Sequence, residues 1–340
     1  MYRESFARSY SVKEIESDNY SIWIGENSLS KLNVSEYSKI GILVDENTKE
    51  FCLPLLSEIK KSVIIEIKSG EQNKNIDTCN LIWNQLTKNS FDRDSLLINL
   101  GGGVIGDMGG FCASTYKRGI DFIQIPTSLL AMVDASVGGK LGIDFNGLKN
   151  QVGLFSNPKT VIINPKFLET LSENELKSGF AEVVKHVLIT DKYSWNHLKN
   201  TPFQDLDWEE IIESSVQIKN KIVMSDPKEK GERKKLNFGH TFGHAIESYY
   251  LQKGTPILHG EAIFMGIILE SELSSLSVSE KNDIKNYILS NFSLPYTPSK
   301  SNLLNFLRND KKNFEGKINF SLLEGIGNCT INNLFSEDEL

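Results

Sequence analysis

The hydrophobic residues in the first half of the chain form short apolar runs, separated by segments with helical spacing. Residues 40–44, 63–67 and 95–100 are such runs, and their length and composition predict strands. Between the last two runs, residues 75–89 carry apolar side chains three or four positions apart, which predicts a helix. Strands that alternate with helices indicate a parallel sheet covered on both faces. Further strands are expected at 21–24, 121–125 and 160–163.

The pattern becomes mostly helical after Pro165, and only residues 317–323 look like a late strand. We therefore expect an α/β domain over residues 1–165 and a mostly α-helical domain over residues 166–340. A chain of 340 residues is long enough for two cores. A cleft between two such halves is a common place for an active site. Helices are predicted at 167–189, 208–224, 240–250, 261–276, 280–290 and 301–308.

Composition narrows the class of protein. The net charge of −7 argues against nucleic acid as a partner, because nucleic-acid binders present basic surfaces. No uncharged apolar run approaches the roughly 20 residues that span a bilayer, so no membrane partner is expected. The first ten residues are polar, unlike a secretory signal, and the four cysteines form no CxxC pair. These features favour a cytoplasmic protein with reduced thiols.

A glycine-rich loop follows the apolar run that ends at Leu100. Residues 101–106 read Gly-Gly-Gly-Val-Ile-Gly and satisfy the pattern G-x-G-x-x-G, in which backbone N–H groups can cradle a pyrophosphate. A simple tight turn explains the same glycines equally well. The usual acidic residue about 20 positions later is not clearly present, Asp121 being the nearest. Asp45, after the strand at 40–44, is a candidate for a ribose hydroxyl or equally for a helix N-cap.

Three of the five histidines, His240, His244 and His259, fall within twenty residues. His240 and His244 are four residues apart and would share one helix face. Neutral imidazoles on one face are a common start for a transition-metal site. The glutamate of HExxH is missing, so a zinc protease is not expected. Glu182, in an otherwise apolar segment, is the candidate carboxylate, and spacing alone would also allow Glu182 to pair with His186.

Several basic residues lie next to glycine, asparagine or apolar segments. Each alone is more often a solvated surface charge, but together they could hold an anion that carries a phosphate and a carboxylate. The residues by themselves therefore predict a two-domain enzyme that uses a metal and a nucleotide on an anionic small molecule. The basic residues in question are Arg118, Lys140, Lys149, Lys185, Lys219 and Arg233.

From about residue 70 to residue 327 the chain resembles the 3-dehydroquinate synthase family of sugar phosphate cyclases. Several motifs in the right order carry this resemblance, which makes it far more specific than any single motif. The matching segments are 69–74, 101–107, 116–119, 126–140, 149–150, 180–185, 229–244, 259–261 and 310–312.

The resemblance implies a Rossmann-like NAD-binding domain followed by a helical domain that binds zinc, or cobalt, through Glu182, His240 and His259. His244 would then be a site residue that does not bind the metal. The implied NAD contacts are Asp45, Asn47, Glu71, Lys74, Gly102, Gly103, Val104, Ile105, Gly106, Asp107, Thr127, Ser128, Lys140, Lys149 and Thr170.

The resemblance also implies a sugar-acid phosphate substrate and a homodimer in which Arg118 reaches the neighbouring subunit's site. One of Lys311 and Lys312 would close over the substrate phosphate. The implied substrate contacts are Asp134, Lys140, Asn150, Lys185, Lys219, Arg233, Asn237 and His244.

The implied reaction converts 3-deoxy-D-arabino-heptulosonate 7-phosphate into 3-dehydroquinate and phosphate. NAD would oxidise the C5 hydroxyl, phosphate would be eliminated, the ketone would be reduced again, and ring opening with an aldol step would close the carbocycle. The alternatives are a sister sugar phosphate cyclase and a polyol dehydrogenase of the same broad fold. The chain departs from the usual family residues at Ser128, Asp144, Leu148, His186 and Pro227, and none of these changes removes an implied ligand or charge.

Overall fold

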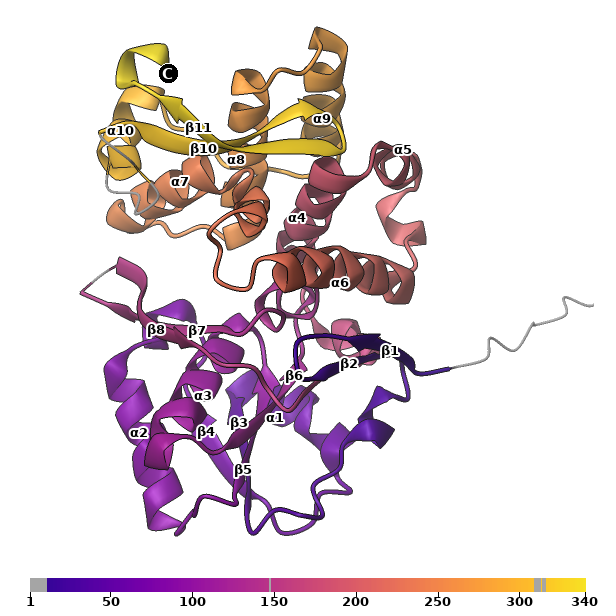
Figure 1. Ribbon diagram of the computed structural model, residues 1–340, viewed down its shortest axis with the longest axis vertical. Coiled ribbons are helices and arrows are strands. Elements are labelled where there is room, and N and C mark those ends of the chain that lie inside the picture. The colour runs from indigo at the N-terminus through magenta and orange to yellow at the C-terminus, as the bar shows by residue number, and fades with distance from the viewer. Residues whose placement is uncertain (1–10, 147, 309–312, 314–315) are drawn as a thin grey trace, which may run out of the picture. The chain divides into compact units, whose positions relative to one another are not determined.

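The computed structural model describes residues 11–146, 148–308, 313 and 316–340 (Figure 1). It divides into two compact units, residues 1–171 and residues 172–340. Each unit is described below by itself.

A twisted parallel sheet forms the centre of the first unit. Within the described residues its strand order is β1-β2-β9-β6-β5-β3-β4, and only the edge pair β1–β2 is antiparallel. The predicted parallel sheet is therefore confirmed. The strands are β1 (Lys13–Glu16), β2 (Ser21–Ile24), β3 (Ile40–Asp45), β4 (Val63–Ile67), β5 (Leu96–Gly101), β6 (Asp121–Pro126) and β9 (Thr160–Ile163).

Both faces of this sheet are buried. Leu43 and Leu97 point to the face covered by α2 (Ile76–Lys88) and α3 (Gly103–Thr115), where they join one apolar cluster with Ile82. The alternate residues of the same strands, such as Ile42 and Ile98, are equally buried on the opposite face. Burial of successive residues explains why the strands appear in the sequence as continuous apolar runs.

A hairpin that was not predicted adds to the first unit. β7 (Lys140–Phe145) and β8 (Leu148–Phe155) pair antiparallel, and Leu141 and Ile143 of β7 pack into the α2–α3 cluster. Gly142 and Gly153 face each other across the hairpin. A Cβ added at Gly153 would lie 2.3 Å from the Leu141 carbonyl oxygen on the opposite strand. Shorter elements of this unit are α1 (Glu46–Phe51) and the helical turns at 28–31, 53–56, 71–73, 116–118, 131–135 and 165–170.

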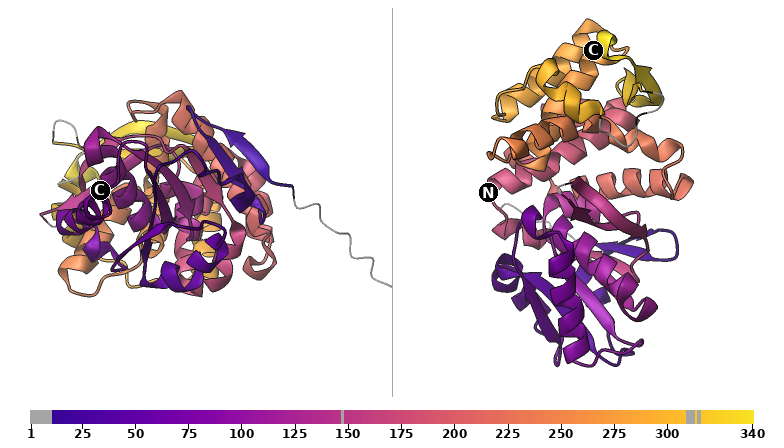
Figure 2. Two further views of the ribbon diagram at one scale, coloured as in Figure 1. Left: turned by 90° about the horizontal axis from the view of Figure 1, so that it is seen from below. Right: turned by 90° about the vertical axis from the view of Figure 1, so that its left-hand side faces the viewer.

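Helices dominate the second unit, together with an antiparallel hairpin of β10 and β11. Phe320 and Leu322 of the hairpin join an apolar cluster with residues of α7 and α8. Figures 1 and 2 show the hairpin in yellow beside these helices in orange. The elements are α4 (Glu173–Thr190), α5 (Lys192–Asn200), α6 (Trp208–Ser225), α7 (His240–Gln252), α8 (His259–Leu273), α9 (Val278–Asn291), α10 (Lys300–Arg308), β10 (Ile318–Gly325), β11 (Asn328–Phe335) and the turns at 203–205, 232–237 and 337–339.

Local signals explain where these helices begin. The helix expected at 167–189 starts only after Ser172, whose hydroxyl caps α4 by accepting a hydrogen bond from the Glu175 amide. The preceding residues form a separate 3-10 turn that begins at Pro165. In the described parts of the chain, no helix combines the length and the hydrophobicity needed to cross a membrane.

Candidate functional site

Three potential metal ligands converge in the second unit from three different helices. Glu182 lies on α4 and is fully buried, His240 is the first residue of α7, and His259 is the first residue of α8. Oε1 of Glu182 lies 3.5 Å from Nε2 of His240 and 3.4 Å from Nε2 of His259. A donor atom from each of the three residues lies within 4.8 Å of the other two.

These distances fit a single metal ion. Ligands bound at about 2.0–2.1 Å in tetrahedral geometry are separated by roughly 3.4 Å, the spacing found here between the carboxylate and each imidazole. One carboxylate and two imidazoles are a donor set that suits Zn²⁺ or Co²⁺. Three protein ligands also leave a fourth position for a substrate oxygen, which is typical of a catalytic site.

The other histidines of this region have different places. The His244 ring lies beside the centre, with its centroid 5.3 Å from that of His240 and 6.4 Å from that of His259. It is not part of the donor group of Glu182, His240 and His259. A donor atom of His186, on the next turn of α4, does lie within 4.8 Å of Glu182, as the sequence spacing allowed.

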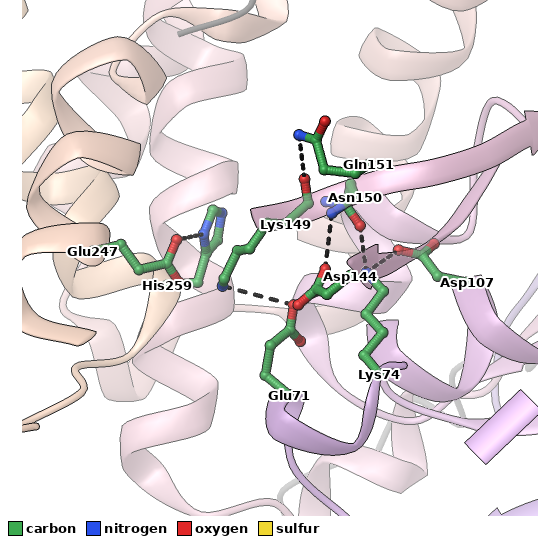
Figure 3. A network of polar contacts seen from close by, with 9 residues as sticks. All are labelled: Glu71, Lys74, Asp107, Asp144, Lys149, Asn150, Gln151, Glu247 and His259. Atoms are coloured by element: carbon green, nitrogen blue, oxygen red, sulfur yellow. Dashed lines mark hydrogen bonds and ion pairs between the residues drawn. The ribbon is translucent and has the colours of Figure 1, made fainter. Parts of the chain in front are cut away.

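Each of the two candidate imidazoles has a polar neighbour at its second nitrogen. Nδ1 of His240 lies 3.1 Å from the carbonyl oxygen of Phe238, and Nδ1 of His259 lies 3.8 Å from a carboxylate oxygen of Glu247 (Figure 3). Such partners fix the ring and leave Nε2 available to a metal. Sequence reasoning missed Glu247. The available signal was its spacing, since His240, His244 and Glu247 stand at positions i, i+4 and i+7 of one helix.

Charge around the centre is balanced by buried groups. Lys185 is buried one turn after Glu182, and its ammonium group contacts the Glu182 carboxylate. Burial acts to lower the pKa of His259, but the neighbouring carboxylates of Glu182 and Glu247 outweigh burial and raise this pKa to about 9. Metal binding at this imidazole would therefore compete with protonation.

The glycine-rich segment of the first unit, residues 101–106, spans the end of β5 and the first turn of α3. Gly102 is the N-cap of α3 and offers no side chain, so the first N–H groups of a 13-residue helix are available to an anion. Close packing explains Gly101 of this segment and Gly109 further along α3. A Cβ at Gly101 would lie 2.5 Å from the Ile105 side chain, and one at Gly109 would lie 2.0 Å from Asn99.

A polar network surrounds Lys74, close to the first turn of α3 (Figure 3). The Lys74 ammonium is 4% exposed and donates to Asp107 Oδ2 and to Asn150 Oδ1, each at 2.7 Å. Burial acts to lower the pKa of Lys74, but Asp107 and Glu71 raise it above its ordinary value. The backbone N–H of Asn150 in turn donates to Asp144 Oδ1 at 2.8 Å. Residues far apart in sequence are thus joined around one buried cation.

Comparisons with known proteins identify the family of this chain. Family profiles described as 3-dehydroquinate synthase N-terminal and 3-dehydroquinate synthase C-terminal match residues 64–178 and 179–313. A 3-dehydroquinate synthase of Parabacteroides distasonis is 41% identical over 321 residues, which cover 91% of each chain. One of Clostridium botulinum is 42% identical over 339 residues, covering 93% of this chain and 95% of the relative. The chain belongs to the 3-dehydroquinate synthase family.

Two solved structures share the fold of this chain. A 2-deoxy-scyllo-inosose synthase, solved with carbaglucose-6-phosphate, NAD⁺ and Co²⁺, has a TM-score of 0.83 at 23% identity, covering 96% of this chain and 97% of its own. The 2-epi-5-epi-valiolone synthase of Streptomyces hygroscopicus, solved with NAD⁺ and Zn²⁺, has a TM-score of 0.84 at 22% identity, covering 97% of both chains. At such identities the similarity shows the fold.

This member of the 3-dehydroquinate synthase family carries further predicted residues in the second unit. Arg233 is 2% exposed, and its Nη1 donates to the Pro227 carbonyl at 2.7 Å. Asp226, which ends α6, shapes the loop before Arg233, because one of its carboxylate oxygens accepts from the amides of Gly231 at 2.7 Å and Arg233 at 3.2 Å. Asn237 donates to Glu229 at 2.7 Å. Lys219 is buried on α6.

The remaining predicted residues of the first unit occupy varied positions. Asp45 caps α1 by accepting from the Thr48 amide at 2.7 Å, so the N-cap alternative is present in the structure, and Asn47 is exposed on that helix. The Thr127 amide donates to the Gly101 carbonyl at 3.0 Å. Lys311 and Lys312 lie outside the described residues. Ser128 follows β6, and Asp134 lies in the turn 131–135. Lys140 begins β7 and Lys149 lies in β8. Thr170 ends the turn 165–170.

Proposed function

We propose that this chain converts 3-deoxy-D-arabino-heptulosonate 7-phosphate into 3-dehydroquinate and phosphate. The observation that carries the proposal is identity of 41–42% over 91–93% of the chain to enzymes named for that product. The site chemistry supports it, because Glu182, His240 and His259 form a complete donor set for a catalytic metal.

We propose NAD as the ligand of the first unit and a zinc or cobalt ion as the ligand of the second. When bound, NAD supplies a reversible hydride acceptor and the metal ion a Lewis acid for hydroxyl and carbonyl oxygens. The α3 N-terminus and Gly102–Asp107 would hold the pyrophosphate, with Thr127 and Ser128 beside them. The Lys74 network would keep Asp107, Asn150 and Glu71 in place.

The side chains of the second unit would bind and orient the substrate. Arg233 suits its carboxylate, because a guanidinium presents paired N–H donors that match the two carboxylate oxygens. Lys219 would add a second positive charge. Lys185 would hold a substrate hydroxyl near Glu182, and His244 would move a proton at an imidazole nitrogen. Asn237 of the same unit would bind the phosphate. The resemblance also assigns substrate contacts to three residues of the first unit, with Asp134 holding a second hydroxyl and Lys140 and Asn150 binding the phosphate.

The test is turnover by the purified protein with zinc and a catalytic amount of NAD. One phosphate released per 3-dehydroquinate formed, with no net NADH, is the expected result. Net NADH formation would instead indicate a polyol dehydrogenase. Turnover of sedoheptulose 7-phosphate or glucose 6-phosphate in place of the proposed substrate would indicate a sister cyclase, whose substrate lacks the carboxylate expected at Arg233.

We also propose that the enzyme is a cytoplasmic homodimer. Arg118 of each subunit would reach across the interface into the active site of the other subunit. Lys117 and Arg118 both adopt a left-handed backbone, with φ of 51° and 72°. Such conformations cost of order 1 kcal/mol each for residues other than glycine, and they concentrate at functional sites. Arg118 is exposed at this turn. The four cysteines are free and buried, which suits a reducing compartment.

Subunit mixing tests the role of Arg118. Arg118→Ala and Lys185→Ala would each be inactive alone. If Arg118 serves the partner's site, a refolded 1:1 mixture contains mixed dimers with one intact site, and about a quarter of the wild-type activity returns. No recovery in a mixture shown to contain mixed dimers would contradict the shared site.

A further inference from the structure

A second carboxylate, Glu270, is tied to the candidate metal centre although it is not one of the three ligands. It lies on α8, three turns after His259, and is 0% exposed. A carboxylate so deeply buried needs hydrogen-bond donors. One of its oxygens accepts from the Gly239 amide at 2.6 Å and the other accepts from the Phe242 amide at 3.0 Å.

These two amides are the ones that a capping box satisfies. Helix α7 begins at His240, so Gly239 is its N-cap and Phe242 its third residue. In a capping box, the N-cap side chain accepts from the third amide and the third side chain accepts from the N-cap amide. Glycine and phenylalanine have no acceptor for either bond. Glu270 therefore supplies both bonds from a neighbouring helix.

The packing of α7 on α8 makes this reach possible. Gly239 has φ of +80°, and a Cβ there would lie 2.6 Å from the Ile267 side chain. A Cβ at Gly266 would lie 1.9 Å from the Gly239 carbonyl oxygen and 2.8 Å from the Gly243 amide. Gly266 and Glu270 are four residues apart and share one face of α8. Only glycines at these crossing points allow the helices to approach closely enough for the carboxylate to span both amides.

The hydrogen bonds of Glu270 affect His240 because of its position in the chain. His240 is the residue that directly follows Gly239, and it lies between the two amides that Glu270 holds. The negative charge is also favourable at a helix N-terminus. The same helix that begins with His259 thus fixes the backbone of His240, so α8 is linked to two of the three donor residues.

We propose that Glu270 is a positioning residue that caps α7 from α8 and holds His240 in place to receive a metal ion. This inference rests on the proposed metal centre. Its test is Glu270→Gln, which is similar in shape but can accept only one of the two bonds without opposing the other amide. The matched control is Ser277→Ala, which removes a cap of the same kind from α9, a helix without a proposed ligand.

Affinity for Zn²⁺ and for Co²⁺, measured by chelator competition, is the first readout. We expect Glu270→Gln to weaken both by about 10–100-fold and to alter the visible spectrum of the Co²⁺ protein. Ser277→Ala should lower the melting temperature and leave affinity and spectrum unchanged. A Glu270→Gln protein that loses stability but keeps wild-type affinity and spectrum would overturn the proposal. Wild-type protein that binds neither ion would overturn the metal centre itself.

Hydrogen exchange of the metal-free wild-type protein provides a second test, which needs no variant to fold. If Glu270 preorganises the turn, the amides of Gly239 and Phe242 are already protected before any metal is added. Exchange of both amides at the rate of an unstructured peptide would contradict the proposal, whatever the metal affinity.

Discussion

The first unit forms its candidate nucleotide site largely from backbone, whereas the second forms its candidate metal centre from side chains. In the first, glycines bring α3 close to the sheet and leave its N-terminal amides available to an anion. In the second, Glu182, His240 and His259 converge from three helices. A backbone site tolerates changes in side chains that do not fill it, while a side-chain site fails when one ligand is lost.

The largest expected effect is therefore in the second unit. His259→Ala removes one of three metal donors, and we expect zinc binding to fall below detection while the fold and NAD binding remain. Metal analysis after gel filtration, with circular dichroism and NAD titration, measures all three. The matched control is His197→Ala, an exposed histidine on α5, which should retain its zinc. Full zinc occupancy in His259→Ala would rule out the ligand assignment.

Arg233→Ala should have the next largest effect. Removing a buried charge that pairs with a substrate carboxylate costs about 2 kcal/mol or more, equivalent to a rise in KM of roughly 30-fold or more. NAD affinity should change little, because Arg233 belongs to the second unit. Steady-state kinetics and NAD titration separate the two, with Lys234→Ala as the neighbouring control. Equal losses for substrate and NAD would refute the carboxylate role.

Lys74→Met tests the site of the first unit. It removes the cation that pairs with Asp107, whose side chain is 20% exposed, and we expect this loss to cost about 2 kcal/mol. We expect a lower melting temperature and weaker NAD binding, with zinc affinity unchanged. Lys149→Ala, which removes a more exposed cation 3.6 Å from Glu71, should lower the melting temperature much less. Loss of zinc in Lys74→Met would show that the two sites are not independent.

The smallest expected effect concerns Asp144, one of the departures from the usual family residues. Burial raises the pKa of Asp144, so its ionisation opposes folding at neutral pH. In Asp144→Asn the new side-chain oxygen can still accept a hydrogen bond from the Asn150 backbone N–H. This variant should therefore have a slightly higher melting temperature at pH 7. The gain should shrink as the pH falls through the raised pKa, since wild-type Asp144 then becomes neutral. A gain that is the same at pH 4 and pH 7 would contradict this cause.

Much of the fold could be predicted because its signals are local. The strand expected at 160–163 and the helix expected at 301–308 appear as β9 and, one residue longer, as α10. The β7–β8 hairpin was missed, although Leu141, Ile143 and Phe145 alternate with other residues as a strand requires. Strand β11 was missed because its polar residues, such as Asn332, interrupt the pattern.

The candidate site, like the fold, was predicted only in part. Clustering of histidines revealed His240 and His259, but the choice of His259 over His244 came from the family resemblance and from the packing of α7 on α8. Glu247, Glu270 and Asp226 were not predicted as site residues. Glu247 shares a helix face with His240 and His244, which was its one sequence signal. Glu270 and Asp226 act through contacts that depend on tertiary structure and on loop conformation, and these contacts leave no short motif in the sequence.

The most direct test of the proposed metal centre is anomalous diffraction at the zinc absorption edge from crystals grown with zinc and NAD. We expect a zinc peak about 2.0–2.2 Å from a Glu182 carboxylate oxygen and from Nε2 of His240 and His259, with NAD bound at the N-terminus of α3. A zinc ion bound instead by His240 and His244, or by Glu182 and His186 without the other two histidines, would contradict it.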